Sequence, residues 1–114
     1  MEVINLSDKK VWKELIKNSP NDNEIIIYKH STICGLSHSV NIIFDNWCEV
    51  HSDTNHIKIL KVDVIFSKSL SRRIAKDLKV VHESPQIIWL DREMKVKFHA
   101  SHYDINEEEL NKHL

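Results

Sequence analysis

The residues best suited to chemistry in this chain are the thiol of Cys34 and the segment Gly35-Leu36-Ser37 that follows it. They come shortly after the apolar run at 25–28, where a buried strand is expected to end and a helix to begin. The free N–H groups of a first helical turn stabilise a thiolate and lower the pKa of a thiol placed beside them. Cys34 is therefore predicted to be a reactive thiol, and the hydroxyl of Ser37 is placed to donate a hydrogen bond to it.

Gly35 is the only glycine of the chain, whereas an average domain of this length carries about eight. Its missing side chain leaves space beside the sulfur of Cys34, so that a bulky disulfide can approach. A cysteine in a loop can also be no more than a small buried residue. We favour a role in redox chemistry or thiol exchange, because the thiol stands at a strand-to-helix junction.

No second cysteine is near enough to form a disulfide with Cys34. Ser37 stands where a dithiol oxidoreductase holds its resolving cysteine, and Cys48 lies 14 residues downstream on the same predicted helix. At about 1.5 Å per helical residue this separation is roughly 20 Å, which is beyond disulfide reach. Cys48 is interpreted as a core residue, and a mixed disulfide on Cys34 would need an outside thiol to resolve it.

The hydrophobic pattern predicts the elements that would position this thiol. Strands are expected over residues 2–6, 24–30, 57–64, 86–90 and 94–100, with a hairpin turn at 91–93. Helices are expected after a cap at Ser7, over about 34–50, after a cap at Ser69 or Ser71, and after a cap at Asn106. Apolar faces of these elements hold the three tryptophans, which are expected in the core: Trp12, Trp47 and Trp89.

The predicted order is β-α-β-α-β-α-β-β-α, which implies parallel strands with crossover helices and an antiparallel pair near the end. With a thiol where the second strand meets its helix and Pro85 before the hairpin, this is the order of the thioredoxin fold, an α/β fold whose central mixed sheet is flanked by helices. Residues 1–114 are expected to form a single domain of this kind. In that fold the position of Pro85 is a cis-proline that faces the active cysteine, and the backbone of Ser84 would offer a strand-like edge to a substrate.

Composition limits the other classes of function. The net charge is −1 with neutral histidines and no basic block is visible, so neither a nucleic acid nor a membrane surface is expected as a partner. The longest apolar runs have about four residues, far fewer than the roughly 18 that a membrane span needs. Residues 1–8 show no signal peptide, and we expect a protein of the reducing cytoplasm with free thiols.

Eight histidines raise the question of a metal site. His30, Cys34 and His38 are spaced four apart, but a strand end and a helix would keep the two histidines from converging. No Cys-x-x-Cys pair is present, and we predict no metal site. His82 is instead a candidate to approach Cys34, where an imidazolium would favour the thiolate.

Five short motifs carry a resemblance to a known family: His30–Cys34, Ser37–His38, Val62–Val64, His82–Gln86 and His99–His102. They resemble the monothiol bacilliredoxin family, also called YtxJ-like proteins, over nearly the whole chain. The resemblance implies a thioredoxin-like fold and removal of the small thiol bacillithiol from mixed disulfides on cytosolic proteins. Cys34 would be the nucleophile, Ser84 and Pro85 would shape the substrate groove, and active-site neighbours would be Thr32, Ser37 and His38.

The same resemblance implies the partners of the reaction. They are S-thiolated client proteins, a low-molecular-weight thiol such as bacillithiol as co-substrate, and a flavin disulfide reductase that acts downstream. No tightly bound cofactor is expected.

Gly35 departs from this family, which usually has proline after the cysteine. The segment Cys34–Ser37 consequently also resembles the Cys-Gly-Phe-Ser motif of monothiol glutaredoxins, which use glutathione and can hold an iron–sulfur cluster. Those proteins carry a Gly-Gly pair near the C-terminus, which a chain with one glycine lacks, so this alternative ranks second. A third interpretation is a thioredoxin-fold interaction protein whose thiol does not turn over.

Overall fold

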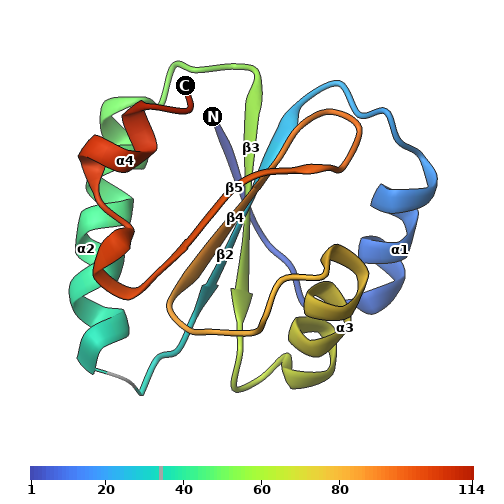
Figure 1. Cartoon of the computed structure of the whole chain (residues 1–114), viewed down its shortest axis with the longest axis horizontal. Helices are drawn as coiled ribbons and strands as arrows, with labels where there is room; N and C mark the ends of the chain where they lie inside the picture. Colours follow the sequence, from blue (N-terminus) through green and yellow to red (C-terminus); the bar gives the residue numbers. More distant parts are fainter. Residues whose placement is uncertain (34) are drawn as a thin grey trace.

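The computed structural model describes residues 1–33 and 35–114, and Cys34 lies outside the described residues (Figure 1). Its elements follow the predicted order, with one additional 3-10 turn, η1, before the last helix. Along the chain they are β1 (Glu2–Asn5), α1 (Lys9–Lys17), β2 (Glu24–His30), α2 (Gly35–Val50), β3 (Ile57–Asp63), α3 (Lys68–Leu78), β4 (Gln86–Leu90), β5 (Val96–Ser101), η1 (His102–Asp104) and α4 (Glu107–Asn111).

The five strands form one mixed sheet in the order β1-β3-β2-β4-β5. β1, β3 and β2 run parallel, whereas β4 pairs antiparallel with both β2 and β5. The predicted mixed α/β sheet is therefore confirmed. β2 lies at the centre of the sheet, and only its two end residues, Glu24 and His30, are partly exposed, as expected of a strand covered on both faces.

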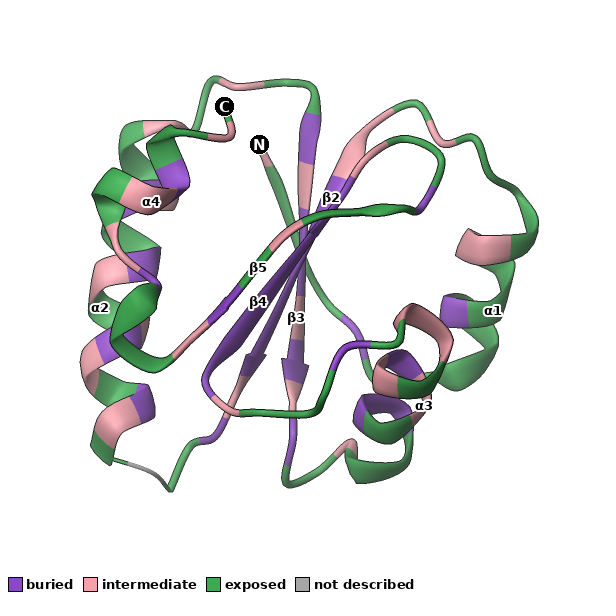
Figure 2. Ribbon diagram, in the orientation of Figure 1, coloured by how far each residue is buried: buried purple, intermediate pink, exposed green. Residues whose placement is uncertain are grey.

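Helices cover both faces of the sheet. α1 and α3 lie on one side of it, and α2 and α4 lie on the other (Figure 1). Figure 2 shows the central strands buried between the two layers. Alternate residues of β2 enter the two cores, with Ile25 and Ile27 facing α1 and α3, and Ile26 and Tyr28 facing α2.

All three tryptophans are buried, which confirms their predicted place in the core. Each indole N–H also finds an acceptor at the edge of the core, as buried tryptophans usually do. The acceptors are Asp77 for Trp12 at 2.9 Å, Asn111 for Trp47 at 2.9 Å, and Glu24 for Trp89 at 2.8 Å.

Two of the predicted helix caps are wrong. Asp8, not Ser7, caps α1, because its carboxylate accepts the N–H of Lys10 at 2.8 Å. Ser69 and Ser71 lie inside α3, which begins after Ser67, whose side chain makes no capping hydrogen bond.

The chain turns before α3 with the help of a different side chain. The carboxylate of Asp63 accepts the N–H groups of Ile65 at 2.8 Å and Phe66 at 3.1 Å. The predicted cap of α4 is confirmed, since Asn106 accepts the N–H of Glu109 at 3.0 Å.

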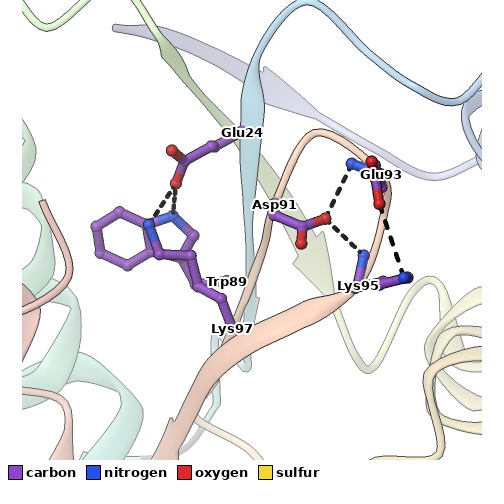
Figure 3. A network of polar contacts seen from close by, with 6 residues as sticks. All are labelled: Glu24, Trp89, Asp91, Glu93, Lys95 and Lys97. Carbon is purple, nitrogen blue, oxygen red and sulfur yellow. Dashed lines mark hydrogen bonds and ion pairs between the residues drawn. The ribbon is translucent and has the colours of Figure 1, made fainter.

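The hairpin turn between β4 and β5 is longer than predicted. The carboxylate of Asp91 accepts the N–H groups of Glu93 at 2.9 Å and Lys95 at 3.0 Å, and so draws residues 91–95 into the turn (Figure 3). Met94, which was expected in the strand, lies in this turn with a φ of 65° and is buried. β5 consequently begins at Val96, and its register against β4 shifts between Trp89 and Leu90.

Within the part of the chain that the structure describes, no helix has the length and apolar character needed to cross a membrane.

Candidate functional site

Three segments meet at the edge of the sheet where β2 and β3 end. Lys29 of β2 is paired with Gln86 of β4, so the residues after β2 lie beside the Ser84–Pro85 segment that precedes β4. His30 is paired with Asp63, and its carbonyl accepts the N–H of Val64 at 2.9 Å, which brings the end of β3 to the same edge. The carboxyl ends of parallel strands are where α/β folds generally place their sites.

Cys34, the predicted nucleophile, lies outside the described residues, but the residues on both sides of it are described. β2 ends at His30 and α2 begins at Gly35, so the thiol belongs to the connection between a central strand and a helix N-terminus. Thr32 and Ile33 on the N-terminal side are exposed, and Ile33 is 80% exposed. Beyond its chain neighbours and its own helix backbone, a Cβ added at Gly35 would meet nothing within 4 Å, and the space beside the sulfur of Cys34 stays a prediction.

Ser37 has a structural contact that the sequence did not indicate. Its side chain is fully buried, and its Oγ accepts the backbone N–H of Ser31 at 3.0 Å. This bond ties the first turn of α2 to the segment that precedes Cys34. The hydroxyl proton of Ser37 is not used in this contact and remains available for donation. The predicted hydrogen bond from Ser37 to Cys34 falls outside the described residues and stays a prediction, as does the role of the exposed His38.

The Ser84–Pro85 peptide bond is cis, as the thioredoxin-like order implied for this position. Pro85 is buried, and its carbonyl accepts the N–H of His102 at 2.9 Å. The Oγ of Ser84 is buried and has no hydrogen-bond partner among the described residues. A buried hydroxyl without a partner is uncommon and costs stability, so Ser84 is a group with hydrogen-bonding capacity to spare at this edge.

Three of the segments that leave or enter the strands at this edge carry exposed apolar side chains. Ile33 follows β2, Phe66 follows β3 and is 84% exposed, and Val81 precedes Pro85 and is 82% exposed. None of the three is among the site residues predicted from the sequence. Their signal is an apolar residue in a segment between two predicted elements, where polar residues are the norm.

Lys29 is the second feature that the sequence analysis missed. Its side chain is fully buried, and its Nζ donates to the carbonyl of Ser71 at 3.0 Å. The Nδ1 of His82 lies 3.2 Å from the same Nζ. Burial lowers the pKa of Lys29 from 10.5 to about 8. The available signal was a lysine inside an otherwise apolar strand.

The surroundings of His82 disfavour a charged ring. Burial, then Lys29 and then Arg72 lower its pKa below the ordinary 6.5, although Glu83 opposes this change. The neutral ring is therefore favoured near pH 7, and an imidazolium, which would favour a thiolate at Cys34, is disfavoured. Its proximity to Cys34 falls outside the described residues.

Cys48 is a core residue, as predicted. It is half-buried against the cluster that contains Phe44 and Trp47, and its thiol is free among the described residues. Burial raises the pKa of its thiol to about 12, and Asp45 adds to this effect against the opposing charge of Lys61. The thiol is protonated at neutral pH and is a poor nucleophile.

The histidines do not converge with other metal ligands in the described chain. His30 is partly buried at the end of β2, stacks on Tyr28 with ring centroids 5.7 Å apart, and has its pKa lowered chiefly by burial. Among residues 1–33 and 35–114, no three His, Cys, Asp or Glu side chains lie close enough together to hold a metal ion.

Comparison with known proteins agrees with this arrangement. Residues 4–110 match the family model described as monothiol bacilliredoxin BrxC. A solved structure described as having a thioredoxin fold is 24% identical, with a TM-score of 0.80 over 96% of this chain and 91% of its own. A thioredoxin from Malassezia sympodialis is 15% identical, with a TM-score of 0.71 over 98% of this chain and 87% of its own.

A thioredoxin from Nicotiana alata is 18% identical, with a TM-score of 0.71 over 98% of this chain and 89% of its own. At these levels of identity, the solved structures establish the thioredoxin fold.

Proposed function

The chain belongs to the monothiol bacilliredoxin family, and on this basis we propose that it removes a low-molecular-weight thiol, bacillithiol, from mixed disulfides on cytosolic proteins through Cys34. The family supports thiol oxidoreductase chemistry in general. The observation that carries the proposal is the position of Cys34 in the chain, between the central strand β2 and the first residue of α2. The segment that follows β2 lies beside Ser84 and Pro85.

The proposed reaction consists of two thiol–disulfide exchanges. The Cys34 thiolate attacks the bacillithiol sulfur of the mixed disulfide, a bond forms between these two sulfurs, and the client cysteine leaves as a thiolate that takes up a proton. A second bacillithiol, as its thiolate, then attacks the bacillithiol sulfur on Cys34. Cys34 leaves as a thiolate, and the product is bacillithiol disulfide, which a flavin disulfide reductase would reduce. Neither exchange needs an outside oxidant, because each breaks one S–S bond and forms another.

The neighbours of Cys34 have separate roles in this proposal. The N–H groups of the first turn of α2 favour the thiolate, and the Ser37–Ser31 hydrogen bond fixes that turn relative to β2. Gly35 adds no side chain in the path of the incoming disulfide. Thr32 and His38 would contact the small thiol or the client, and the backbone of Ser84 would pair with an extended client segment.

The environment of Cys48 supports a mechanism with one thiol. A resolving cysteine must form a thiolate and reach the mixed disulfide, whereas burial raises the pKa of Cys48 to about 12. The second exchange therefore requires a thiol from outside the chain.

The rate of alkylation by iodoacetamide, measured across pH, tests the activation of the thiol. The expected result is a Cys34 pKa clearly below the ordinary value of about 8.5, in wild type and in Cys48→Ser alike. With free bacillithiol present, wild type and Cys48→Ser should remove bacillithiol from a modified model client, and Cys34→Ser should not. A Cys34 pKa at or above 8.5, or a client that stays modified, would overturn the proposal.

A second candidate function rests on Gly35, which replaces the proline usual in the family and gives the segment its likeness to monothiol glutaredoxins. Two chains and two small thiols would hold an iron–sulfur cluster through Cys34. Anaerobic reconstitution would then give a coloured dimer that Cys34→Ser abolishes. A colourless monomer would reject this candidate.

A further inference from the structure

Lys29 places a charge in the interior of the protein, one residue before the end of the central strand. The strand residues paired with it are Val62 of β3 and Gln86 of β4, and neither carries a charge. No carboxylate pairs with its ammonium among the described residues, and burial alone accounts for its lowered pKa. A buried ammonium without a counter-charge is costly, and such groups are concentrated at functional sites.

The ammonium joins three segments of the chain. From β2 it reaches the carbonyl of Ser71 in α3 at 3.0 Å and the imidazole Nδ1 of His82 at 3.2 Å. The Oγ of Ser71 also lies 3.1 Å from this Nδ1. We refer to Lys29, Ser71 and His82 as the Lys29 cluster. Because the ammonium can only donate, Nδ1 is the acceptor and the ring proton resides on Nε2.

His82 connects this cluster to the edge that would receive a client. It stands two residues before Ser84 in the connection between α3 and β4, and its exposed side chain brings Nδ1 to 3.2 Å from the buried Nζ of Lys29. A second buried side chain holds the same connection, since Gln86 Nε2 donates to the carbonyl of Val81 at 2.9 Å and its Oε1 accepts the N–H of Glu83 at 3.4 Å. The segment before the cis-proline is thus held by two buried polar side chains.

We propose that Lys29 is a positioning residue for the exchange reaction, whose ammonium holds His82 and thereby fixes the Ser84–Pro85 edge against which a client segment pairs. This inference rests on the proposed function of Cys34. It assigns to Lys29 the alignment of the client, not the chemistry at sulfur.

The contact depends on protonation at both of its ends. The Nδ1 of His82 must be unprotonated to accept, and the Lys29 ammonium must keep its proton to give a charge-assisted bond. Burial sets the pKa of Lys29 at about 8, and burial, Lys29 and Arg72 set that of His82 below 6.5 against the opposing charge of Glu83. In acid, protonated His82 and the Lys29 ammonium are two cations next to each other. Above about pH 8, neutral Lys29 is a weaker hydrogen-bond donor to His82.

Four variants separate this role from a general structural one. Lys29→Met fills the same buried space without a charge, and His82→Leu removes the acceptor from an exposed position. His82→Asn keeps an acceptor oxygen in place of Nδ1 but cannot titrate. Lys95→Met is the matched control, because Lys95 is an exposed lysine in the turn between β4 and β5.

The Michaelis constant KM for a bacillithiol-modified client peptide is the kinetic readout, measured from pH 5 to 9.5. Wild type should bind the client best between the two pKa values, with KM rising on both sides. Lys29→Met and His82→Leu should raise KM at pH 7 by about tenfold, the factor expected for loss of one hydrogen bond to a charged group. The alkylation rate of Cys34 should change less than about twofold, and Lys95→Met should match wild type.

The shape of the pH profile distinguishes the variants further. His82→Asn should lose the rise of KM in acid and retain the rise above about pH 8. Lys29→Met should show neither rise. A purely structural role of Lys29 would shift KM by the same factor at every pH.

Amide hydrogen exchange gives a second readout that does not require activity. Lys29→Met and His82→Leu should speed exchange of residues 80–84 by about tenfold and leave residues 91–95 unchanged, whereas His82→Asn should stay close to wild type. An inactive wild-type protein would overturn the proposed function, and the exchange data would still decide whether Lys29 positions the segment. Unchanged KM and unchanged exchange in Lys29→Met and His82→Leu would overturn the positioning role.

Discussion

Strand β2 carries a charged side chain near each of its ends, and the two have opposite surroundings. At the start, the carboxylate of Glu24 accepts the indole N–H of Trp89 at 2.8 Å and forms an ion pair with Lys97 at 2.7 Å (Figure 3). The same Lys97 Nζ lies 4.9 Å from the centre of the Trp89 ring. Near the other end, Lys29 is fully buried and is bound only to a carbonyl and a neutral imidazole among the described residues.

The pKa values express this difference. Burial raises the pKa of Glu24, but hydrogen bonds from Lys97 and Trp89 outweigh it, and the pKa is lowered. Glu24 therefore stabilises the fold by joining β2 to the β4–β5 hairpin. Lys29 has its pKa lowered by burial alone and so costs stability at neutral pH. The paired charge lies at the end of β2 away from Ser84–Pro85 and the uncompensated charge lies beside that segment, which is the distribution expected when one serves the fold and the other serves the site.

Lys29→Met should give the largest effect, an increase in the free energy of unfolding at pH 7. The folded-state pKa of about 8 lies below the ordinary 10.5, so the cost of the charge is fully present below pH 8 and disappears as pH rises toward 10.5. At about 1.4 kcal/mol per pKa unit, the gain is at most about 3.5 kcal/mol, less the contribution of the hydrogen bonds lost. Urea unfolding at pH 7 and pH 10 measures it. A lower free energy of unfolding for Lys29→Met at pH 7 would show that the hydrogen bonds of the ammonium outweigh the cost of burying it.

Glu24→Gln should act in the opposite direction and lower the free energy of unfolding at pH 7 by about 1–2 kcal/mol. The depressed pKa of Glu24 means that its contribution is present above pH 4.5 and is lost as pH falls through the folded-state pKa. Denaturation at pH 7 and pH 3 should therefore show a larger difference from wild type at pH 7 than at pH 3. A double-mutant cycle with Lys97→Met should assign most of the loss to the pair, and additive effects would contradict the pairing.

Gly35→Ala should stabilise the protein by about 0.5 kcal/mol, because alanine restricts the unfolded chain more than glycine does. Gly35 has no positive φ, and an added Cβ would meet no atom within 4 Å, so the folded state accommodates the methyl group. Thermal unfolding measures the change. A loss of stability would mean that the space beside Gly35 is occupied, which would weaken the view of this edge as open.

Lys95→Ala should have the smallest effect, within about 0.5 kcal/mol of wild type. Its ion pair with Glu93 spans 3.7 Å between side chains that are both mostly exposed, in contrast to the shielded Glu24 pair. The variant is the baseline for the comparison, measured by the same urea unfolding. A loss as large as that of Glu24→Gln would show that shielding does not separate the two pairs.

The order of the elements was predictable because it depends on hydrophobic periodicity. The central strand was placed at 24–30, the bounds that the structure has, since a strand buried on both faces differs sharply from its polar flanks. The caps of α1 and α3 were wrong because several polar residues precede each helix. The residue that caps the helix is decided by the direction in which the chain leaves the preceding strand.

The Lys29 cluster could not be predicted for a related reason. A lysine in an apolar strand usually extends its amine to solvent or to a carboxylate, and sequence does not show that α3 and His82 close over this one. The orientation of the His82 ring depends on the same contacts with Lys29 and Ser71. In contrast, the core position of Cys48 followed from helical spacing alone.

The most direct test of the account is the intact mass of the protein after one exchange without reductant. A client protein carrying bacillithiol on a single cysteine is incubated with an excess of wild type, Cys34→Ser or Cys48→Ser, and both partners are weighed. The bacillithiol mass should leave the client and appear on wild type and on Cys48→Ser, but not on Cys34→Ser. A client that keeps its bacillithiol, or an adduct that persists in Cys34→Ser, would contradict it.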